Sequence, residues 1–347
     1  MEELSVKVSF SETDGKNVAI INLPDKFQFL SSAVVNGGFA VSDTVVILQV
    51  HKNYSSEKPE EDLFEVYRKL KLKNNAIGFM TASNIKKVLT VSTKKVNNVK
   101  VISIATAGTS NAVFAGENPN TQTNDLNNKI GTINIISILN VPLQKTGLTN
   151  AVMTITEAKT AALWDHGIEA TGTTSDAVAI ATPIGDGYKY AGTATDVGIA
   201  IAKSVREAVF NSIRKAGDKP CPKDFLTVLG EKGISIKDMW EAAKELYVPH
   251  PRWDLKVLKK MFIRSLRTLQ KDINVNAMIL AAALLEEASV KNKLYGLSAE
   301  EFMKDPVHLL TDEILGMALA EYIAGTKGLF EYVRYDTNKP GIIRKLG

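Results

Sequence analysis

Two charged residues interrupt an otherwise small and apolar segment, MTITEAKTAAL at residues 153–163. Glu157 and Lys159 are two positions apart, so a helix would direct them to different faces. One is then expected to face a binding site and the other solvent. For hydrolysis, Glu157 would suit a general base, and Lys159 would activate a neighbour or hold an anionic intermediate. The alternative is an ordinary solvated helix face.

Three segments rich in glycine and small hydroxyl residues accompany this pair, at residues 106–116, 170–183 and 188–198. Such backbone approaches a ligand closely, and the short side chains add donors and acceptors, so the three segments together predict a site for an oxygen-rich ligand or an oxyanion. Any one of them alone would suit a tight turn. None of the four histidines falls in these segments, so no Ser-His-Asp triad is legible.

If these segments form a catalytic site around an oxyanion, each of its parts has a candidate among their residues. Thr109 or Ser110 would be a nucleophile, and Asp176 a second base beside Glu157. The Gly108 N–H and the Asn111 side chain would form an oxyanion hole. The predicted substrate contacts are completed by Thr173 and Ser175.

The elements that must position these residues divide at residues 215–222, where Gly217, Pro220 and Pro222 end a helix. The predicted domains are residues 1–216 and 223–347. In the first, β-branched runs at 18–21, 45–50, 99–105, 132–139 and 177–181 alternate with helical stretches at 59–72, 148–164 and 197–215. This pattern predicts an α/β or α+β domain with a mixed sheet.

The second half contains helical patterns only, at 222–232, 236–246, 254–271, 277–293 and 312–324, which predict an all-α helical bundle. Its segment 276–285 is so apolar that we expect it to be central, and Glu286 and Glu287 follow it directly. Acids on a buried helix are costly unless they are paired or bind metal. With Asp312 and Glu313 they predict an oxygen-ligated divalent cation, Mg²⁺ by preference. A favourable helix-dipole interaction is the alternative for Asp312 and Glu313.

Composition restricts the class of protein. The chain has 347 residues, 45% hydrophobic and 23% charged, with a net charge of +4 that is spread over both halves, which argues against a nucleic-acid-binding protein. We see no apolar run of the ~18–20 residues that a membrane span needs and no signal peptide, and therefore expect a cytoplasmic protein. The single cysteine, Cys221, excludes a disulfide within the chain. A homo-oligomer is compatible with all of this.

The first domain resembles the adenosylcobinamide amidohydrolase family. The resemblance rests on TAGTSNAVFAG at 106–116, GTINIISIL at 131–139, TEAKTAAL at 156–163 and ATGTTSDAVAIA at 170–181, in this order. It implies cleavage of the amide between the corrin propionate and aminopropanol, which yields adenosylcobyric acid. The corrinoid is then a substrate and not a cofactor, and no cofactor is implied for this domain.

The second half resembles the soluble branch of the phosphatidylglycerophosphatase A-like superfamily. The matching residues are Asp312-Glu313-x-x-Gly316 and the ending Asp336-x-x-Lys339-Pro340-Gly341-Ile342-Ile343. The resemblance implies dephosphorylation of α-ribazole 5′-phosphate, with a divalent metal on Asp312 and Glu313 and the phosphate near Lys339 and Asp336. The two resemblances together predict a bifunctional hydrolase of cobamide assembly. The alternative is a corrinoid-binding protein with a magnesium-dependent phosphatase domain of other specificity.

Overall fold

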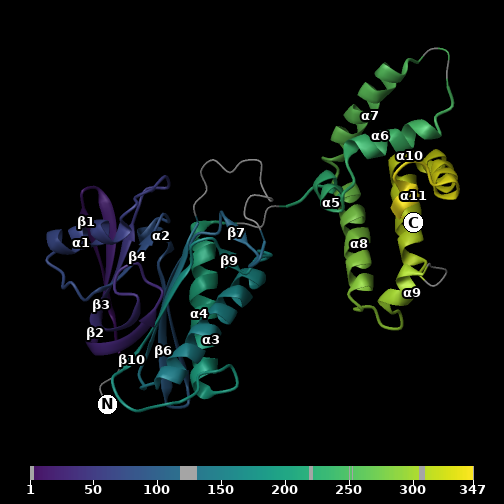
Figure 1. The fold of residues 1–347 in the computed structure, drawn as a ribbon. Coiled ribbons are helices and arrows are strands. Elements are labelled where there is room, and N and C mark those ends of the chain that lie inside the picture. Colours follow the sequence, from purple (N-terminus) through teal and green to yellow (C-terminus); the bar gives the residue numbers. More distant parts are fainter. Residues whose placement is uncertain are drawn as a thin grey trace. The chain divides into compact units, whose positions relative to one another are not determined.

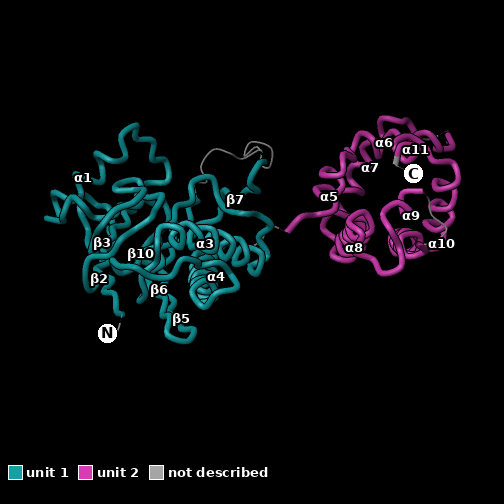
Figure 2. Tube along the Cα trace, turned by 60° about the horizontal axis from the view of Figure 1, so that its bottom comes forward, with its two compact units in different colours: residues 1–220 teal, residues 221–347 magenta. Residues whose placement is uncertain are grey.

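The chain divides into two compact units, residues 1–220 and 221–347 (Figure 2). The computed structural model describes residues 4–117, 131–218, 222–249, 251, 253–304 and 309–346. Cys221 lies outside the described residues. The fold class predicted from the sequence is confirmed, because a mixed sheet with helices is followed by a stretch of mostly helices.

The first unit is built on one eight-stranded sheet in the order β4-β3-β2-β10-β8-β6-β5, with β1 paired to β2. β3 and β4 are parallel, as are β8 and β10, and the other neighbours are antiparallel. The five predicted strand runs all lie in strands of this sheet. The strands are β1 Lys7–Thr13, β2 Lys16–Ser31, β3 Gly38–Gln49, β4 Ile77–Thr81, β5 Thr90–Val96, β6 Val99–Ala107, β8 Ile133–Leu139 and β10 Ala177–Pro183.

Two long helices, α3 (Lys145–Asp165) and α4 (Asp196–Ala216), cover one face of β6, β8 and β10 (Figure 1). The Thr195 side chain caps the start of α4 by accepting from the Gly198 N–H, and Gly217 ends it in the left-handed conformation. Alanines on both helices allow close packing onto the isoleucines and valines of the strands. This packing fixes where the residues of α3 lie relative to the ends of the strands.

The opposite face of the sheet is also buried. There β2, β3 and β4 contribute residues such as Phe29, Ile47 and Phe79 to a cluster with Ile104 and Ile136 of the central strands, and α2 (Ile85–Val88) adds to it. Helix α1 (Pro59–Lys69) packs with a further cluster on β3 and β4. Strands buried on both faces explain the continuous apolar runs in the sequence.

The described part of the second unit consists of helices joined by turns and loops. Its longest helix, α10, has Gly325 at φ 62° and ψ −152°, which breaks the helical path and brings its two halves together. Serine or aspartate side chains cap α5 to α9. The helices are α5 Phe225–Glu231, α6 Ile236–Glu245, α7 Leu255–Leu269, α8 Ile273–Val290, α9 Ala299–Met303, α10 Thr311–Asn338 and α11 Ile343–Leu346.

The expectation that the apolar segment 276–285 is central is wrong in this structure. Of α8, only Val275 and Ser289 are buried, while Leu280 and Leu284 are about half exposed. The helix packs against α5, α9 and α10, which leaves its remaining surface open. By length and composition it is the one helix in the described part of the chain that would be able to cross a membrane.

Candidate active site

Two of the three glycine-rich and hydroxyl-rich segments meet at one end of the central strands of the sheet. β8 and β10 are parallel and β6 is antiparallel to β8, so the end of β6 lies beside the starts of the other two strands. A small ladder between β7 (Ala112–Val113) and β9 (Gly172–Thr173) joins the segments that follow β6 and precede β10 (Figure 1). The sheet topology therefore brings residues 108–113 and 171–176 together.

The third segment, residues 188–198, does not join them. Tyr188 pairs with Leu143 before α3, and Asp196 accepts a hydrogen bond from Asn97 in the turn before β6. Both contacts lie at the end of the sheet opposite to the end of β6. The expectation that all three segments line one site is therefore wrong. Residues 188–198 lead into α4 and form its first turn.

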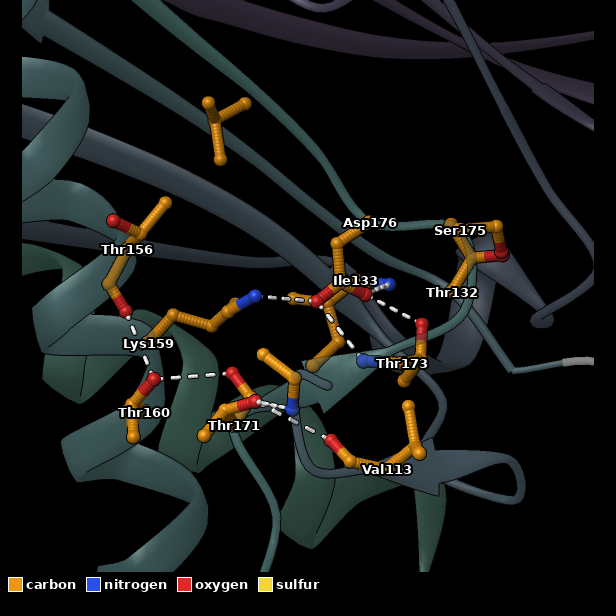
Figure 3. Close-up of polar contacts among 12 residues, drawn as sticks. Val113, Thr132, Ile133, Thr156, Lys159, Thr160, Thr171, Thr173, Ser175 and Asp176 are labelled. Atoms are coloured by element: carbon orange, nitrogen blue, oxygen red, sulfur yellow. Dashed lines mark hydrogen bonds and ion pairs between the residues drawn. The ribbon is translucent and has the colours of Figure 1, made fainter. Parts of the chain in front are cut away.

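A buried ion pair joins α3 to the assembled segments. Lys159 Nζ lies 2.5 Å from Asp176 Oδ2, with the side chains 10% and 12% exposed (Figure 3). Asp176 also accepts from the Ile133 N–H at 3.1 Å, and from the Thr173 N–H at 3.0 Å and Oγ1 at 2.5 Å. A Cβ on Gly172 would lie 2.4 Å from Asp176 Oδ2 and 2.6 Å from Lys159 Nζ, so a larger residue there would displace this pair.

The charged residues at positions 157 and 159 of α3 face different ways, as their spacing predicts. Lys159 is the inward one, and Glu157 is exposed. Glu157 lines an open groove of about 750 Å³ between α3 and the β7–β9 ladder, with Thr160, Trp164, Ala115 and Thr171. No described residue forms a hydrogen bond or an ion pair with its carboxylate. Glu157 is therefore available to a ligand in the groove.

Of the two candidate nucleophiles, Thr109 is buried and Ser110 is exposed. The Thr109 hydroxyl donates to Asp218 Oδ2 at 2.8 Å, and the Thr109 N–H donates to the same oxygen at 2.7 Å. The Asp218 carbonyl contacts His166 Nε2 at 2.8 Å, which ties it to the end of α3. Sequence reasoning missed Asp218, because nothing in the local pattern beyond Gly217 marks it.

The predicted oxyanion donors are engaged within the protein. The Gly108 N–H donates to the Thr132 carbonyl at 3.1 Å, as part of the ladder between β6 and β8, so it is not free for an oxyanion. Asn111 accepts from the Gly131 N–H at 2.9 Å and donates to Thr174 at 2.6 Å. These bonds favour a role for both residues in holding the loop.

The predicted substrate contacts in this unit are also engaged. Ser175 Oγ lies 2.8 Å from Thr132 Oγ1 and donates to the Gly131 carbonyl at 3.2 Å. Thr173 donates twice to Asp176. Both residues thus help to fix the edge of the sheet beside the groove.

The four acids predicted as metal ligands in the second unit are not gathered. Glu286 pairs with Lys232 at 2.6 Å and Glu287 with Lys291 at 2.5 Å on the exposed part of α8, so neither is a buried acid that needs a metal. Glu313 accepts from the Tyr332 hydroxyl at 2.8 Å. Within the described ranges, no three His, Cys, Asp or Glu side chains are placed to hold a metal ion. The four residues therefore do not fit a shared metal site.

The kink in α10 brings the region of Asp312 and Glu313 towards the region of Asp336, the two regions on which the phosphatase resemblance rests. Burial and the hydrogen bond to Glu313 raise the pKa of Tyr332, and the nearby charges of Asp336 and Asp312 raise it further. Asp336 pairs with Lys339 at 2.6 Å. Glu313 thus contacts the Tyr332 hydroxyl, and the charges of Asp312 and Asp336 act on it, although sequence reasoning did not single out Tyr332.

Comparison with known proteins identifies the first unit. A family described as adenosylcobinamide amidohydrolase matches residues 1–220. An adenosylcobinamide amidohydrolase of Methanosarcina mazei is 32% identical over 196 residues, which cover 54% of this chain and 88% of that protein. Another, of Halobacterium salinarum, is 42% identical over 85 residues, 24% of this chain and 36% of that protein. An uncharacterised protein of Methanocaldococcus jannaschii is 34% identical over 106 residues, 30% of this chain and 80% of that protein. The chain belongs to the adenosylcobinamide amidohydrolase family.

Proposed function

We propose that the first unit hydrolyses the amide that joins aminopropanol to the corrin ring of adenosylcobinamide. Family membership supports the reaction class. The structural observation that carries the proposal is the groove beside α3, where the carboxylate of Glu157 lies next to a buried Lys159–Asp176 pair. A free acid on the wall of a groove suits a general base, because its lone pairs are open to a water or a substrate proton.

In this reaction Glu157 takes a proton from water as the water oxygen bonds to the amide carbonyl carbon. The C–N bond then breaks, and the proton passes to the aminopropanol nitrogen, which leaves as the amine. The products are the corrinoid carboxylic acid and aminopropanol. Asp176 is surrounded by four donors, which favours a positioning role over that of a second base. Lys159 fixes α3 to the loops and supplies positive charge beside the groove.

A second route uses Thr109 as the nucleophile. Its hydroxyl already donates to the Asp218 carboxylate, which is the contact that an activated hydroxyl needs. Glu157→Gln separates the two routes, because it removes the base of the water route and leaves Thr109 unchanged. Loss of amide cleavage in this variant favours water activation, and retained cleavage favours Thr109.

The test of the function is incubation of the purified full chain with adenosylcobinamide, followed by chromatography of the corrinoids. Adenosylcobyric acid and aminopropanol are expected in equal amounts. Absence of the acid in the presence and absence of added divalent cations would overturn the proposal. Corrinoid binding without cleavage would favour a corrinoid-binding protein.

For the second unit we propose a phosphatase that converts α-ribazole 5′-phosphate to α-ribazole. The support is its resemblance to the soluble phosphatidylglycerophosphatase A-like proteins, and the kink that places Asp312 and Glu313 in the same region as Asp336. We derive no step through a metal, because the predicted ligands do not converge. On the water-soluble character of both substrates we also propose a cytoplasmic location.

Release of inorganic phosphate from α-ribazole 5′-phosphate tests this second activity. Asp312→Asn should abolish it and leave amide cleavage intact, and Glu300→Gln, on the exposed start of α9, is the matched control. Measurements with added Mg²⁺ and with a chelator test the metal. Equal turnover of unrelated phosphate monoesters would instead favour a phosphatase of other specificity.

A further inference from the structure

One aromatic side chain in the first unit is exposed and yet held in place. Trp164, near the end of α3, is 56% exposed. Its Nε1–H donates to the Ala170 carbonyl at 3.2 Å, and the Phe114 ring meets it edge-on with 6.3 Å between the centroids. Because the polar atom of the indole is already paired, the exposed part of the ring offers apolar surface only.

Trp164 stands at one side of the groove that Glu157 also lines. The groove has a volume of about 750 Å³, within the range of roughly 300–1,000 Å³ that small-molecule sites occupy. An exposed, oriented aromatic ring in such a groove is typical of a stacking surface.

The threonines of the groove use their hydroxyls internally. Thr160 donates to the Thr156 and Thr171 carbonyls at 3.1 and 3.0 Å (Figure 3). Thr156 donates to the Met153 carbonyl at 2.8 Å. Thr171 accepts from the Ala115 N–H at 2.8 Å. Their methyl groups are left to contact a ligand.

The groove therefore combines methyl groups and one aromatic ring with a single free acid. Glu157 is that acid, and Lys159, the one cation among the described residues of the wall, is committed to Asp176. Among these described residues, a highly charged ligand such as a nucleotide would lack partners. A flat, uncharged ring system that carries one reactive polar group matches this distribution.

We propose that this groove is the binding site for a flat, uncharged ring of the substrate, which stacks on Trp164 so that the scissile amide lies near Glu157. The assignment of the ring to a corrinoid rests on the proposed amidohydrolase function. In adenosylcobinamide this chemistry belongs to the adenine of the adenosyl group, because the cobalt–corrin unit carries a net positive charge and bears amide side chains on both faces.

Equilibrium dialysis of the full chain tests the proposal independently of turnover. The ligands are adenosylcobinamide, cobinamide without the adenosyl group, and 5′-deoxyadenosine. Trp164→Ala should raise the Kd about five- to 150-fold, the range that loss of one stacked ring produces, and Trp164→Phe should restore part of the affinity. Met153→Ala is the matched control, because Met153 is also 56% exposed on α3 and is not among the residues that line the groove.

The ligands identify the ring. Weakening for adenosylcobinamide and 5′-deoxyadenosine, with the affinity for cobinamide unchanged, supports adenine. Equal weakening for cobinamide would mean that another part of the corrinoid contacts Trp164, and it would overturn the assignment of the ring. Unchanged affinity in Trp164→Ala, or an equal loss in Met153→Ala, overturns the site. If the wild-type chain cleaves adenosylcobinamide and Trp164→Ala binds it with the same Kd, the proposed binding site is wrong and the proposed function stands. If binding depends on Trp164 and the wild-type chain does not cleave the ligand, the proposed function is wrong and the binding site stands.

Discussion

The Lys159–Asp176 pair should contribute strongly to the stability of the first unit, and Asp176→Ala is the sharpest test. The substitution leaves a nine-tenths buried ammonium without its carboxylate and removes the acceptor of the Ile133 and Thr173 N–H groups. Removing one partner of a buried pair costs about 3–5 kcal/mol. Lys159→Met should cost less, about 1–3 kcal/mol, because the carboxylate keeps three other donors.

Urea unfolding followed by Trp164 fluorescence measures these costs in the first unit. Trp240 and Trp253 lie in the second unit, so a background with both changed to phenylalanine leaves one reporter. With a slope of about 1–3 kcal/mol per M, a loss of about 3 kcal/mol lowers the urea midpoint by roughly 1–3 M. Arg206→Met is the control, since Arg206 and Asp165 form an exposed pair on α4 and α3 that should contribute about 1 kcal/mol or less.

The three variants are compared by how far each lowers the urea midpoint. If Asp176→Ala lowers the midpoint no more than Arg206→Met, the pair does not hold α3 to the loops. If Lys159→Met is the more damaging change, the carboxylate is not the centre of the network. Either result would refute the reasoning from burial and hydrogen bonding.

Three further predictions follow from the same structure. Glu157→Gln should lower kcat for adenosylcobinamide about 10²–10⁴-fold with little change in the urea midpoint, because the carboxylate is exposed and unpaired among described residues; a normal kcat would exclude it as the base. Asp218→Ala should cost about 1–3 kcal/mol in urea unfolding, since the buried Thr109 N–H and hydroxyl lose their acceptor. Burial, and then the hydrogen bond to Asp62, raise the pKa of Tyr54 to about 12. Because the tyrosine of the unfolded chain ionises at a lower pH, the stabilising contribution to the free energy of unfolding is present below pH 10 and should be lost as the pH rises towards 12. The urea midpoint of Tyr54→Phe should therefore fall less over this range.

Much of the fold follows from the sequence because the signals are local. The central strands are apolar on both faces and stand out as β-branched runs, and α4 has a capping threonine at one end and Gly217 at the other. Strands β1, β4 and β5 were missed. β1 and β5 alternate between exposed and less exposed residues and carry charges, and β4 is only five residues long. The identity of β1 and β5 depends on pairing with β2 and β6, which no local pattern reports.

The site was predictable in its residue types and less so in its geometry. Spacing placed Glu157 and Lys159 on different faces, but only the position of β9 decides that Lys159 is the inward one. Asp218 reaches Thr109 across 109 positions of the chain, so no short motif reveals it. Composition grouped residues 188–198 with the site although they start α4, because helix caps and ligand loops use the same small hydroxyl residues.

The positions of Lys159 and Glu157 on α3 suggest what two charges so close in sequence can do in this chain. Lys159 ties the helix to Asp176 and thereby to the starts of β8 and β10. Glu157 is two residues away on the same rigid helix, so its carboxylate is held at a fixed level beside the groove while it stays solvated and free to take a proton. A base on a loop would lose this placement, and a base buried like Asp176 would lose its free lone pairs. In the proposed reaction the inward ion pair positions the outward acid, so damage to either residue should impair amide cleavage for a different physical reason.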